Sequence, residues 1–327
     1  MRHEVFVLMW MISKASTITP ILVIMLAVTT ILSSNSITTT TTSYGYSPCN
    51  CVIFVMDDMA DHGANSVQLA TMDYFISKNM PFTPSIVIAD IGNTTNSRVL
   101  NKVKEGVDKQ LFEIAIHGYR HLNHSLLTKE VQVNDFIKAN ERLEILFGKR
   151  SDIFVPPYDD FNLHTIEAMS ELNISLISTS QYKEAIVTNP YRSQTLDEIE
   201  TNNSKLGVSK ISDQESLVYH APYTVSILYL HKNGLFGDDL VHEALRLIDD
   251  SIAKYGFAQV RLHPTDFAQV DPTTGTVNAE GVRIPKVINE VDDIKFQELT
   301  RIVDNLVARN IRIASIAEIY PYSYPYS

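Results

Sequence analysis

From Cys51 onward the sequence alternates short apolar runs, rich in β-branched residues, with stretches whose apolar residues recur at helical spacing. This alternation is typical of βαβ units and a parallel sheet. The expected strands are Val52–Met56, Ser85–Asp90, Phe112–Ile116, Ile153–Val155, Ile174–Ser178, Leu217–Tyr219, Ala258–Leu262 and Ile311–Ala314. About seven or eight strands suffice to close a barrel. We therefore predict an α/β fold, a distorted (β/α) barrel of about seven strands, over residues 50–320.

Two stretches interrupt this alternation. Residues 181–214 are polar with few paired apolar residues, and residues 271–293 include the turn-rich segment DPTTGTVNAEG. Clusters of Gly, Pro, Asn and Asp mark turns and loops. We therefore expect both stretches to be long loops or insertions.

The N-terminal region differs from the rest of the chain. Residues 5–32 are almost entirely apolar, and their densest part, residues 21–32, is short for a membrane span but suits the apolar region of a signal peptide. A Ser/Thr-rich tract with nothing to bury follows. We expect a signal peptide or an N-terminal membrane anchor at residues 1–34, a stalk at residues 35–49, and a secreted or cell-surface protein. A buried core helix is the alternative for the apolar run.

The charge distribution argues against a nucleic-acid partner. The formal net charge is -11, and no basic cluster offers a footprint for a phosphate backbone. The two cysteines, Cys49 and Cys51, are too close together for an easy disulfide and too few for a metal cluster. Two ordinary thiols or one strained bridge are the interpretations that remain.

Polar residues repeatedly follow the predicted strands, where a parallel α/β barrel collects its functional groups. In chain order they are Asp57 and Asp58 after the first strand, His117 and His121 after the third, PPYDDFN (156–162) after the fourth, and His263 after the seventh. Each feature alone has an ordinary explanation, because an Asp pair often caps a helix and a single histidine is often a loop or core residue. Their convergence on one end of one barrel favours a functional site.

These side chains suit metal-assisted hydrolysis. One Asp and two His provide three protein ligands of the kind that zinc takes, and they leave a coordination position for water. A second carboxylate can act as general base, and a histidine on another strand can protonate the leaving group. The sequence contains no Gly-x-Ser-x-Gly, P-loop or dinucleotide-binding pattern, so serine-hydrolase and nucleotide chemistries have no support.

The order of the motifs resembles the polysaccharide deacetylases of the NodB-homology type, carbohydrate esterase family 4. VMDDM (55–59) stands where that family has Asp-Asp, and HGYRH (117–121) stands where it has His-Ser/Thr-x-x-His. FVPPYDDFN (154–162) replaces the Arg-x-Pro-Tyr motif, and RLHPTDF (261–267) the Leu-x-His motif. The resemblance covers residues 50–320 and implies a NodB-like barrel.

The resemblance also implies roles for the matched residues. Asp58, His117 and His121 would bind a divalent metal, with zinc as first choice and cobalt or another transition metal as alternatives. Asp57 would be the general base and His263 the general acid.

In the loop after the fourth strand, the resemblance implies that Pro157, Tyr158 and Asp159 contact the substrate. Tyr158 would also offer its backbone N–H to the oxyanion, which makes it a catalytic residue. Asp159 and Asp160 could instead cap the helix that begins near Asn162, and capping is the favoured interpretation.

The sequence departs from the family pattern at several positions. Val155 occupies the position where many members carry an arginine that orients the base, so either another cation such as Arg261 or Arg120 substitutes or the base is less constrained. The motif Asp-x-x-Asp-Trp is missing, since the single tryptophan lies in the N-terminal apolar segment. Asp266, three residues past His263, could tune that histidine.

The remaining histidines have ordinary interpretations. We interpret His124 as a loop residue. The segment 220–223, which begins with His220, follows a strand and is placed to line the cleft. The others are expected to be structural or on the surface: His62, His164, His220, His231 and His242.

The expected function is the removal of acetyl groups from N-acetylated sugars of a polysaccharide or glycan by an exported metal-dependent hydrolase, with membrane attachment through the N-terminal apolar segment as an option. A non-catalytic cell-surface carbohydrate-binding protein that retains the metal site is the first alternative. A metal hydrolase acting on another ester or amide is the second, because a fold does not fix a substrate.

Overall fold

A computed structural model of the protein describes residues 49–94, 96–180, 209–210, 218–277 and 283–319. These residues all belong to one unit of the chain, Gly45–Ser327. The predicted signal peptide or anchor, and the stalk up to residue 48, lie outside the described residues. Within the described part, no helix is both long enough and apolar enough to cross a membrane.

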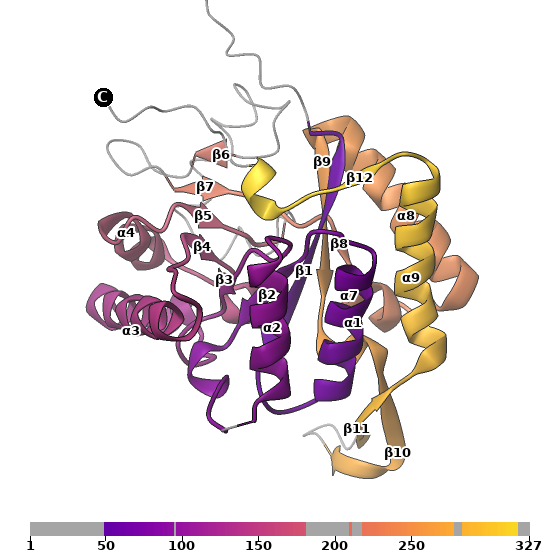
Figure 1. The fold of residues 1–327 in the computed structure, drawn as a ribbon, viewed down its shortest axis with the longest axis horizontal. Coiled ribbons are helices and arrows are strands. Elements are labelled where there is room, and N and C mark those ends of the chain that lie inside the picture. The colour runs from indigo at the N-terminus through magenta and orange to yellow at the C-terminus, as the bar shows by residue number, and fades with distance from the viewer. Residues whose placement is uncertain (1–48, 95, 181–208, 211–217, 278–282, 320–327) are drawn as a thin grey trace, which may run out of the picture. The chain divides into compact units, whose positions relative to one another are not determined.

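The main sheet is built from ten strands, nearly all of them parallel (Figure 1). They are β1 (Cys51–Met59), β2 (Thr83–Ile86), β3 (Ala115–Ile116), β4 (Ile153–Phe154), β5 (Leu176–Ile177), β6 (Ser209–Lys210), β7 (Tyr219–His220), β8 (Val225–Ser226), β9 (Phe257–Leu262) and β12 (Arg312–Ile313). Their order is β6-β7-β5-β4-β3-β2-β1-β9-β8, with β12 paired to the start of β1. Among the described strands of this sheet, β6 and β7 are the one antiparallel pair.

The segment from β7 to β8 closes this sheet into a ring. β7 pairs with β5 and β8 pairs with β9, although the two short strands are separated only by residues 221–224. Between them, the N–H of Tyr223 donates to the carbonyl of Thr179 at 2.9 Å, and that of Thr224 donates to the carbonyl of Gln259 at 3.0 Å. Residues 219–226 therefore act as one strand, and the predicted distorted (β/α) barrel of about seven strands is confirmed.

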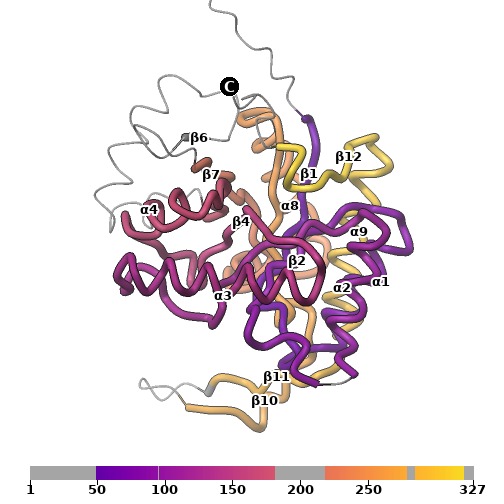
Figure 2. The backbone as a smooth tube through the Cα atoms, turned by 60° about the vertical axis from the view of Figure 1, so that its left-hand side comes forward, coloured from indigo at the N-terminus to yellow at the C-terminus, as the bar shows by residue number. Residues whose placement is uncertain are grey.

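Helices cover the outside of the ring. The α-helices are α1 (Asn65–Ser77), α2 (Arg98–Asp108), α3 (Lys129–Phe147), α4 (Leu163–Glu171), α7 (Ile227–Lys232), α8 (Gly237–Tyr255) and α9 (Asp293–Ala308). The short 3-10 helices are η1 (Ile88–Asp90), η2 (His124–Leu126), η3 (Pro157–Asp159), η4 (Pro264–Phe267) and η5 (Ile316–Ile319). Neighbouring pairs are α1 with α2, α3 with α4, and α8 with α9 (Figures 1 and 2).

Alternate residues of β1 face two different cores. Phe54 packs outward against Phe75 of α1, with ring centroids 5.3 Å apart. Ile53 and Val55 pack inside the barrel with the buried residues of the neighbouring strands. Because side chains alternate along a strand, Asp57 continues the inward series begun by Ile53 and Val55. The barrel interior therefore has an apolar floor with a carboxylate directly above it.

Within the stretch 271–293, residues 271–277 and 283–291 belong to a β-hairpin, so of the two expectations the long loop is wrong and an insertion is found. β10 (Ala268–Val277) and β11 (Arg283–Val291) pair with each other and project away from the main sheet (Figures 1 and 2). Most of their side chains are exposed, so the hairpin lacks the buried apolar alternation that reveals a strand in a sequence. Of the other expected loop, residues 181–214, only β6 is described.

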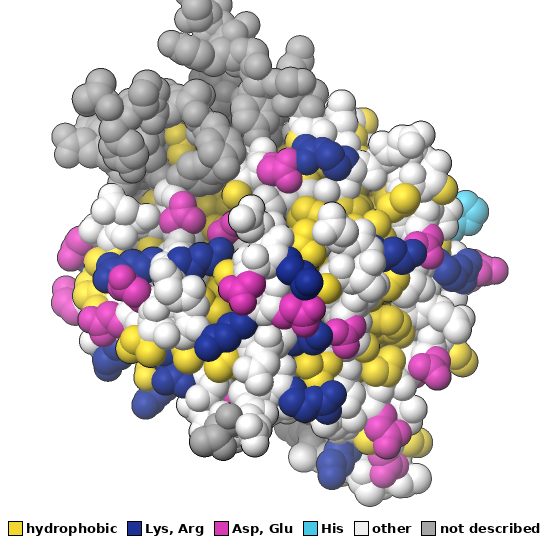
Figure 3. All heavy atoms as spheres, viewed as in Figure 1, with side chains coloured by type: hydrophobic (Ala, Val, Ile, Leu, Met, Phe, Trp, Pro, Cys, Tyr) yellow, Lys and Arg dark blue, Asp and Glu magenta, His cyan; other side chains and the backbone are white. Residues whose placement is uncertain are grey.

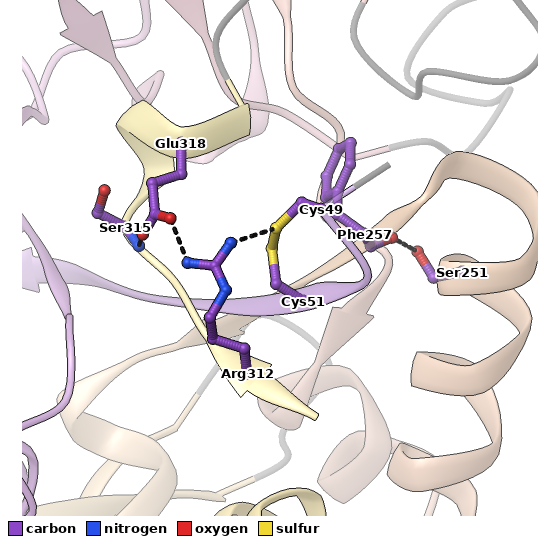
Figure 4. Close-up of a disulfide and its surroundings, with 7 residues drawn as sticks. All are labelled: Cys49, Cys51, Ser251, Phe257, Arg312, Ser315 and Glu318. Atoms are coloured by element: carbon purple, nitrogen blue, oxygen red, sulfur yellow. Dashed lines mark hydrogen bonds and ion pairs between the residues drawn. A yellow bond between two sulfur atoms is a disulfide. The ribbon is translucent and has the colours of Figure 1, made fainter. Parts of the chain in front are cut away.

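Cys49 and Cys51 form a disulfide at the start of β1 (Figure 4). Their Cα atoms are 5.1 Å apart, which lies within the usual range for a disulfide, because Asn50 between them takes a left-handed φ of 45°. Arg312 of β12 donates to Cys49 Sγ at 3.6 Å and also to the carboxylate of Glu318. Of the two interpretations of these cysteines, the bridge is the one found.

Charged side chains of both signs are interspersed on the face shown in Figure 3. Lys and Arg side chains do not gather there into one large patch. The absence of a nucleic-acid partner stays a prediction.

Candidate active site

A cleft of about 520 Å³ opens at the carboxyl ends of the parallel strands. All six residues predicted to be catalytic or to bind metal line it: Asp57, Asp58, His117, His121, Tyr158 and His263. They come from β1, from the loop after β3, from η3 and from the end of β9. The convergence expected from the positions of these residues after predicted strands is therefore found.

The end of β1 turns two consecutive carboxylates toward the cleft. On a regular strand Asp57 and Asp58 would face opposite sides. Asp58 instead has a φ of 57°, and the pairing of β1 with β2 shifts register between Met56 and Met59. Bulges of this kind re-aim side chains next to active sites. Asp57 remains 4% exposed, whereas the side chain of Asp58 is 46% exposed.

His117 is oriented by the backbone of a neighbouring strand. Its Nδ1 lies 2.7 Å from the carbonyl oxygen of Val155, which can only accept a hydrogen bond. Neutral His117 therefore carries its proton on Nδ1 and turns the lone pair of Nε2 toward Asp58, whose Oδ1 is 3.1 Å away. A lone pair and a carboxylate oxygen that face each other at this distance require a cation or a proton between them.

His121 completes the group through a tight turn. Gly118 takes a φ of 75°, and a Cβ there would lie 2.7 Å from the carbonyl oxygen of Arg120. The turn brings Nε2 of His121 to 3.0 Å from Oδ1 of Asp58. The ring of His121 also packs edge-on against Tyr158, with centroids 4.6 Å apart.

The three predicted metal ligands fit one ion. One ligand atom from each of Asp58, His117 and His121 lies within 4.8 Å of the other two. Burial would raise the pKa of Asp58, but the neighbouring imidazoles outweigh burial and hold its pKa well below the ordinary range, so the carboxylate is charged. Two imidazoles and one carboxylate are a donor set that zinc and related transition metals accept.

Arg261 contacts the predicted base. Its Nη1 donates to Oδ2 of Asp57 at 2.5 Å, and its Nη2 donates to Oγ of Ser178 at 2.7 Å. Burial would lower the pKa of Arg261, but Asp57, Tyr223 and Asp159 together outweigh burial and raise the pKa, so the guanidinium is charged. The other candidate cation, Arg120, is exposed. Of the two cations considered in place of an arginine at Val155, the structure brings Arg261 to the base.

His263 lies beside Asp57, at the end of β9. Its Nε2 is 3.9 Å from Oδ2 of Asp57, and its Nδ1 is 3.8 Å from Oδ2 of Asp266. Asp266 also accepts the backbone N–H of His263 at 2.7 Å. Burial would lower the pKa of His263, but Asp266, Asp57 and Asp58 outweigh it and raise the pKa. The predicted acid and the residue proposed to tune it therefore lie side by side.

The loop after β4 has an unusual backbone. Tyr158 and Asp159 both take left-handed φ angles, 62° and 57°. Such conformations cost energy in residues other than glycine and cluster at functional sites. Tyr158 is 65% exposed and lines the cleft. Pro157 is buried, and its neighbour Pro156 lines the cleft instead.

Asp159 and Asp160 do not cap the following helix, so the favoured interpretation of these residues was wrong. The cap of α4 is Asn162, which forms a capping box with Thr165. Asp159 accepts from the N–H of Ser180 at 2.8 Å and from the hydroxyl of Tyr223 at 3.3 Å. Asp160 accepts from Ser125 and Asn123.

Further cleft residues come from the segment that closes the barrel. Tyr223 lines the cleft as expected, whereas His220 is buried and lies 2.8 Å from Oγ1 of Thr179. Tyr229 and Lys232 of α7 also line the cleft and were not predicted. The two-residue strand β8, which leads directly into α7, is too short for a periodic signal.

His124 lies in the loop between β3 and α3, as predicted, but within the short 3-10 helix η2. It is fully buried in η2, stacks on Phe136 and lies 3.4 Å from Asp135. His231 pairs with Glu298 at 2.8 Å, and His62 and His164 lie beside acidic residues at the surface. None of these histidines lines the cleft.

Together, the fold and the site define a class of protein: a distorted parallel (β/α) barrel with an Asp-His-His group at the carboxyl ends of its strands. Residues 45–177 match the polysaccharide deacetylase family. Over these residues the match agrees with the resemblance found in the sequence. It includes Asp57, Asp58, His117 and His121, and ends before His263.

Solved structures of that family are similar in fold. A CE4 family pseudoenzyme from Bacillus anthracis is 14% identical, with a TM-score of 0.50 over 83% of this chain and 65% of that chain. A mutant of it with restored enzymatic activity aligns with the same identity and TM-score, over 83% of this chain and 67% of its own. A peptidoglycan N-acetylglucosamine deacetylase is 14% identical, with a TM-score of 0.50 over 84% of this chain and 89% of that chain. The chain thus spans less than two thirds of the first of these proteins. No curated protein matches the chain by sequence.

Proposed function

We propose that the protein is a metal-dependent hydrolase that removes acetyl groups from N-acetylated sugars of a polysaccharide or glycan. The observation that carries this proposal is the meeting of three metal-ligand atoms, from Asp58, His117 and His121, with a buried carboxylate and a histidine in one cleft. The family match supports the reaction class.

The residues around the cleft have complementary tasks. A divalent ion held by Asp58, His117 and His121, zinc as first choice and cobalt or another transition metal as alternatives, would polarise the acetyl carbonyl and acidify a water molecule. Asp57 takes the proton from the attacking water. The raised pKa of His263 lets that histidine keep a proton for the departing amine.

The loop after β4 serves the oxyanion. The left-handed backbone of Tyr158 presents this residue to the cleft, and its N–H stabilises the negative charge that develops on the acetyl oxygen. The exposed ring of Tyr158 offers a surface for a sugar ring.

We also propose that the protein acts outside the cell or at its surface. The apolar residues 5–32 and the Ser/Thr-rich tract after them support export. The disulfide between Cys49 and Cys51 agrees with an oxidising compartment.

The experiment is an acetate-release assay on oligomers of N-acetylglucosamine and on O-acetylated sugars, with bound metal measured on the same samples. Asp57→Asn is expected to lower the rate by at least about 100-fold, which is the low end of what a general base contributes. Asp108→Asn, an exposed carboxylate at the end of α2, is the matched control. An Asp57→Asn variant with unchanged acetate release would remove Asp57 from the mechanism.

The alternative is a non-catalytic carbohydrate-binding protein that keeps the metal site. Val155 in the position of the family arginine, and the missing Trp motif, favour it. Stoichiometric metal and glycan binding without turnover of any acetylated sugar would support this alternative. Turnover of other esters or amides alone would instead indicate a different substrate class.

A further inference from the structure

Arg261 is a buried cation whose guanidinium is held from three sides. It is 2% exposed, and its Nη1 and Nη2 donate to Asp57 of β1 and to Ser178, the residue after β5. The guanidinium also lies over the ring of Tyr223, with 4.4 Å between its central carbon and the ring centroid. Three different parts of the barrel therefore fix one cation.

The contact leaves the two oxygens of Asp57 in different situations. Oδ2 accepts from Arg261, whereas Oδ1 is buried without a hydrogen-bond partner among the described residues. Asp57 lines the cleft, and Oδ1 is its oxygen that no described protein group holds. A carboxylate held by one oxygen presents the other in a fixed direction.

The register of the strands explains how the arginine reaches this position. Arg261 pairs with Val55, which lies two residues before Asp57 on the same inward face of β1. The long side chain therefore reaches forward along β1 to the carboxylate, and Arg261 also lines the cleft. Val155 is fully buried among the apolar residues inside the barrel, so it offers no charge to Asp57. Arg261 is the arginine that holds this carboxylate, with His263 further away at 3.9 Å.

Tyr223 links the same arginine to the loop after β4. Its ring lies against Arg261, and its hydroxyl donates to Asp159 at 3.3 Å. Asp159 is the neighbour of Tyr158, and both have left-handed backbones. Tyr223 thus contacts both the support of Asp57 and the loop that holds Tyr158.

We propose that Arg261, fixed by Ser178 and Tyr223, is the positioning residue for Asp57. The inference rests on the proposed function, in which Asp57 is the base. In this role Arg261 acts through Asp57, by fixing the orientation of the Asp57 carboxylate at the cleft. A buried ion pair adds little to stability by itself, so a role in orientation accounts better for its place beside the cleft.

The test is a double-mutant cycle with Arg261→Met, Asp57→Asn and the double variant, assayed for kcat, KM and bound metal. Arg261→Met is expected to lower kcat about 100-fold with KM and metal content nearly unchanged, because misplacing a reacting group costs about that much. In the Asp57→Asn background the same substitution should have no further effect, because its effect passes through Asp57. Independent, multiplying effects would overturn the proposal.

Two further variants separate orientation from folding. Arg261→Lys keeps the charge but cannot donate to Asp57 and Ser178 as a fork, so kcat should fall between wild type and Arg261→Met. Arg142→Met removes an arginine that bonds Ile88, Ile91 and Asn93 outside the cleft, and it controls for loss of stability. A similar loss of kcat in Arg142→Met would overturn the proposal.

A crystal structure of Arg261→Met tests the inference even if no substrate is turned over. The Asp57 carboxylate should lose its single orientation while Asp58, His117 and His121 keep theirs. An unchanged Asp57 would overturn the positioning role. Failure of wild type to release acetate from any substrate would overturn the proposed function alone.

Discussion

The Nδ1 atom of His117 lies 2.7 Å from the carbonyl oxygen of Val155, across the neighbouring strands β3 and β4. The contact uses only the backbone of Val155, so it does not depend on which side chain that position carries. Hydrogen bonds of this kind fix the ring orientation and tautomer of a metal-binding histidine. Val155 therefore supports the metal site through its backbone, while its side chain belongs to the barrel floor.

Removing the carboxylate of the metal site should abolish tight metal binding. Asp58→Asn replaces a charged ligand shared by His117 and His121 with a neutral amide. We expect metal affinity to fall by more than about 100-fold, the upper end of what changes to supporting residues cost. Isothermal titration with Zn²⁺, with Asp108→Asn as control, measures this. Equal affinity in Asp58→Asn and wild type would show that the ion binds elsewhere.

Metal removal should affect stability as well as activity. A ligand that binds only the folded protein raises the free energy of unfolding, by about 2.7 kcal/mol at 100 times its Kd. We expect dialysis against a chelator to lower the melting temperature and stop acetate release, and Zn²⁺ or Co²⁺ to restore both. The assignment would be contradicted if metal did not change the melting temperature of wild type, or if it changed that of Asp58→Asn by the same amount.

The turn at Gly118 should be required for the position of His121. In Gly118→Ala the new Cβ would lie 2.7 Å from the carbonyl oxygen of Arg120, in addition to the left-handed φ of 75°. Gly148→Ala is the matched control, because Gly148 has a φ of 71° with no atom within 4 Å of such a Cβ. Both variants should lose about 1 kcal/mol of stability from the backbone conformation.

Only Gly118→Ala should also lose metal affinity, because only there does the clash displace the turn that carries a ligand. Denaturant unfolding and metal titration of the two variants separate the effects. Equal metal affinity in both would mean that the turn tolerates the added methyl group.

The metal-ligand group could be predicted because it depends on simple geometry. Asp58 lies at the end of β1 and His117 directly follows β3, and parallel strands bring their carboxyl ends to one edge. The alternative interpretations of these residues, as a helix cap or as a loop residue, depend on local contacts. The strand order of the barrel places the residues at the cleft regardless of those contacts. The contact of Arg261 with Asp57 could not be predicted in the same way, because it depends on the register of β1 and β9.

Other parts of the fold left no clear signal in the sequence. The hairpin of β10 and β11 is largely exposed, so turn residues dominate its sequence although pairs such as Val270 and Val287 join its strands. β8 has two residues, and its place in the ring is fixed by pairing with β9. Lys232 and Tyr229 reach the cleft only because α7 follows that strand directly.

The acid limb and the alkaline limb of the activity should respond differently to Asp266. The carboxylate of Asp266 lies 3.8 Å from Nδ1 of His263 and, against the effect of burial, raises the pKa of that histidine. A general acid works while it is protonated, so activity that depends on His263 is present below its pKa and is lost as the pH rises through it. A raised pKa therefore extends activity to higher pH.

Asp266→Asn should move the alkaline limb of kcat/KM to lower pH, because the neutral amide no longer stabilises the imidazolium. The amide oxygen can still accept the backbone N–H of His263, so the turn at η4 should be kept. Rate measurements across the pH range, with Asp108→Asn as control, test this. An alkaline limb that stays in place would mean that another group is the acid, whereas a shift that disappears in His263→Asn would assign the limb to His263.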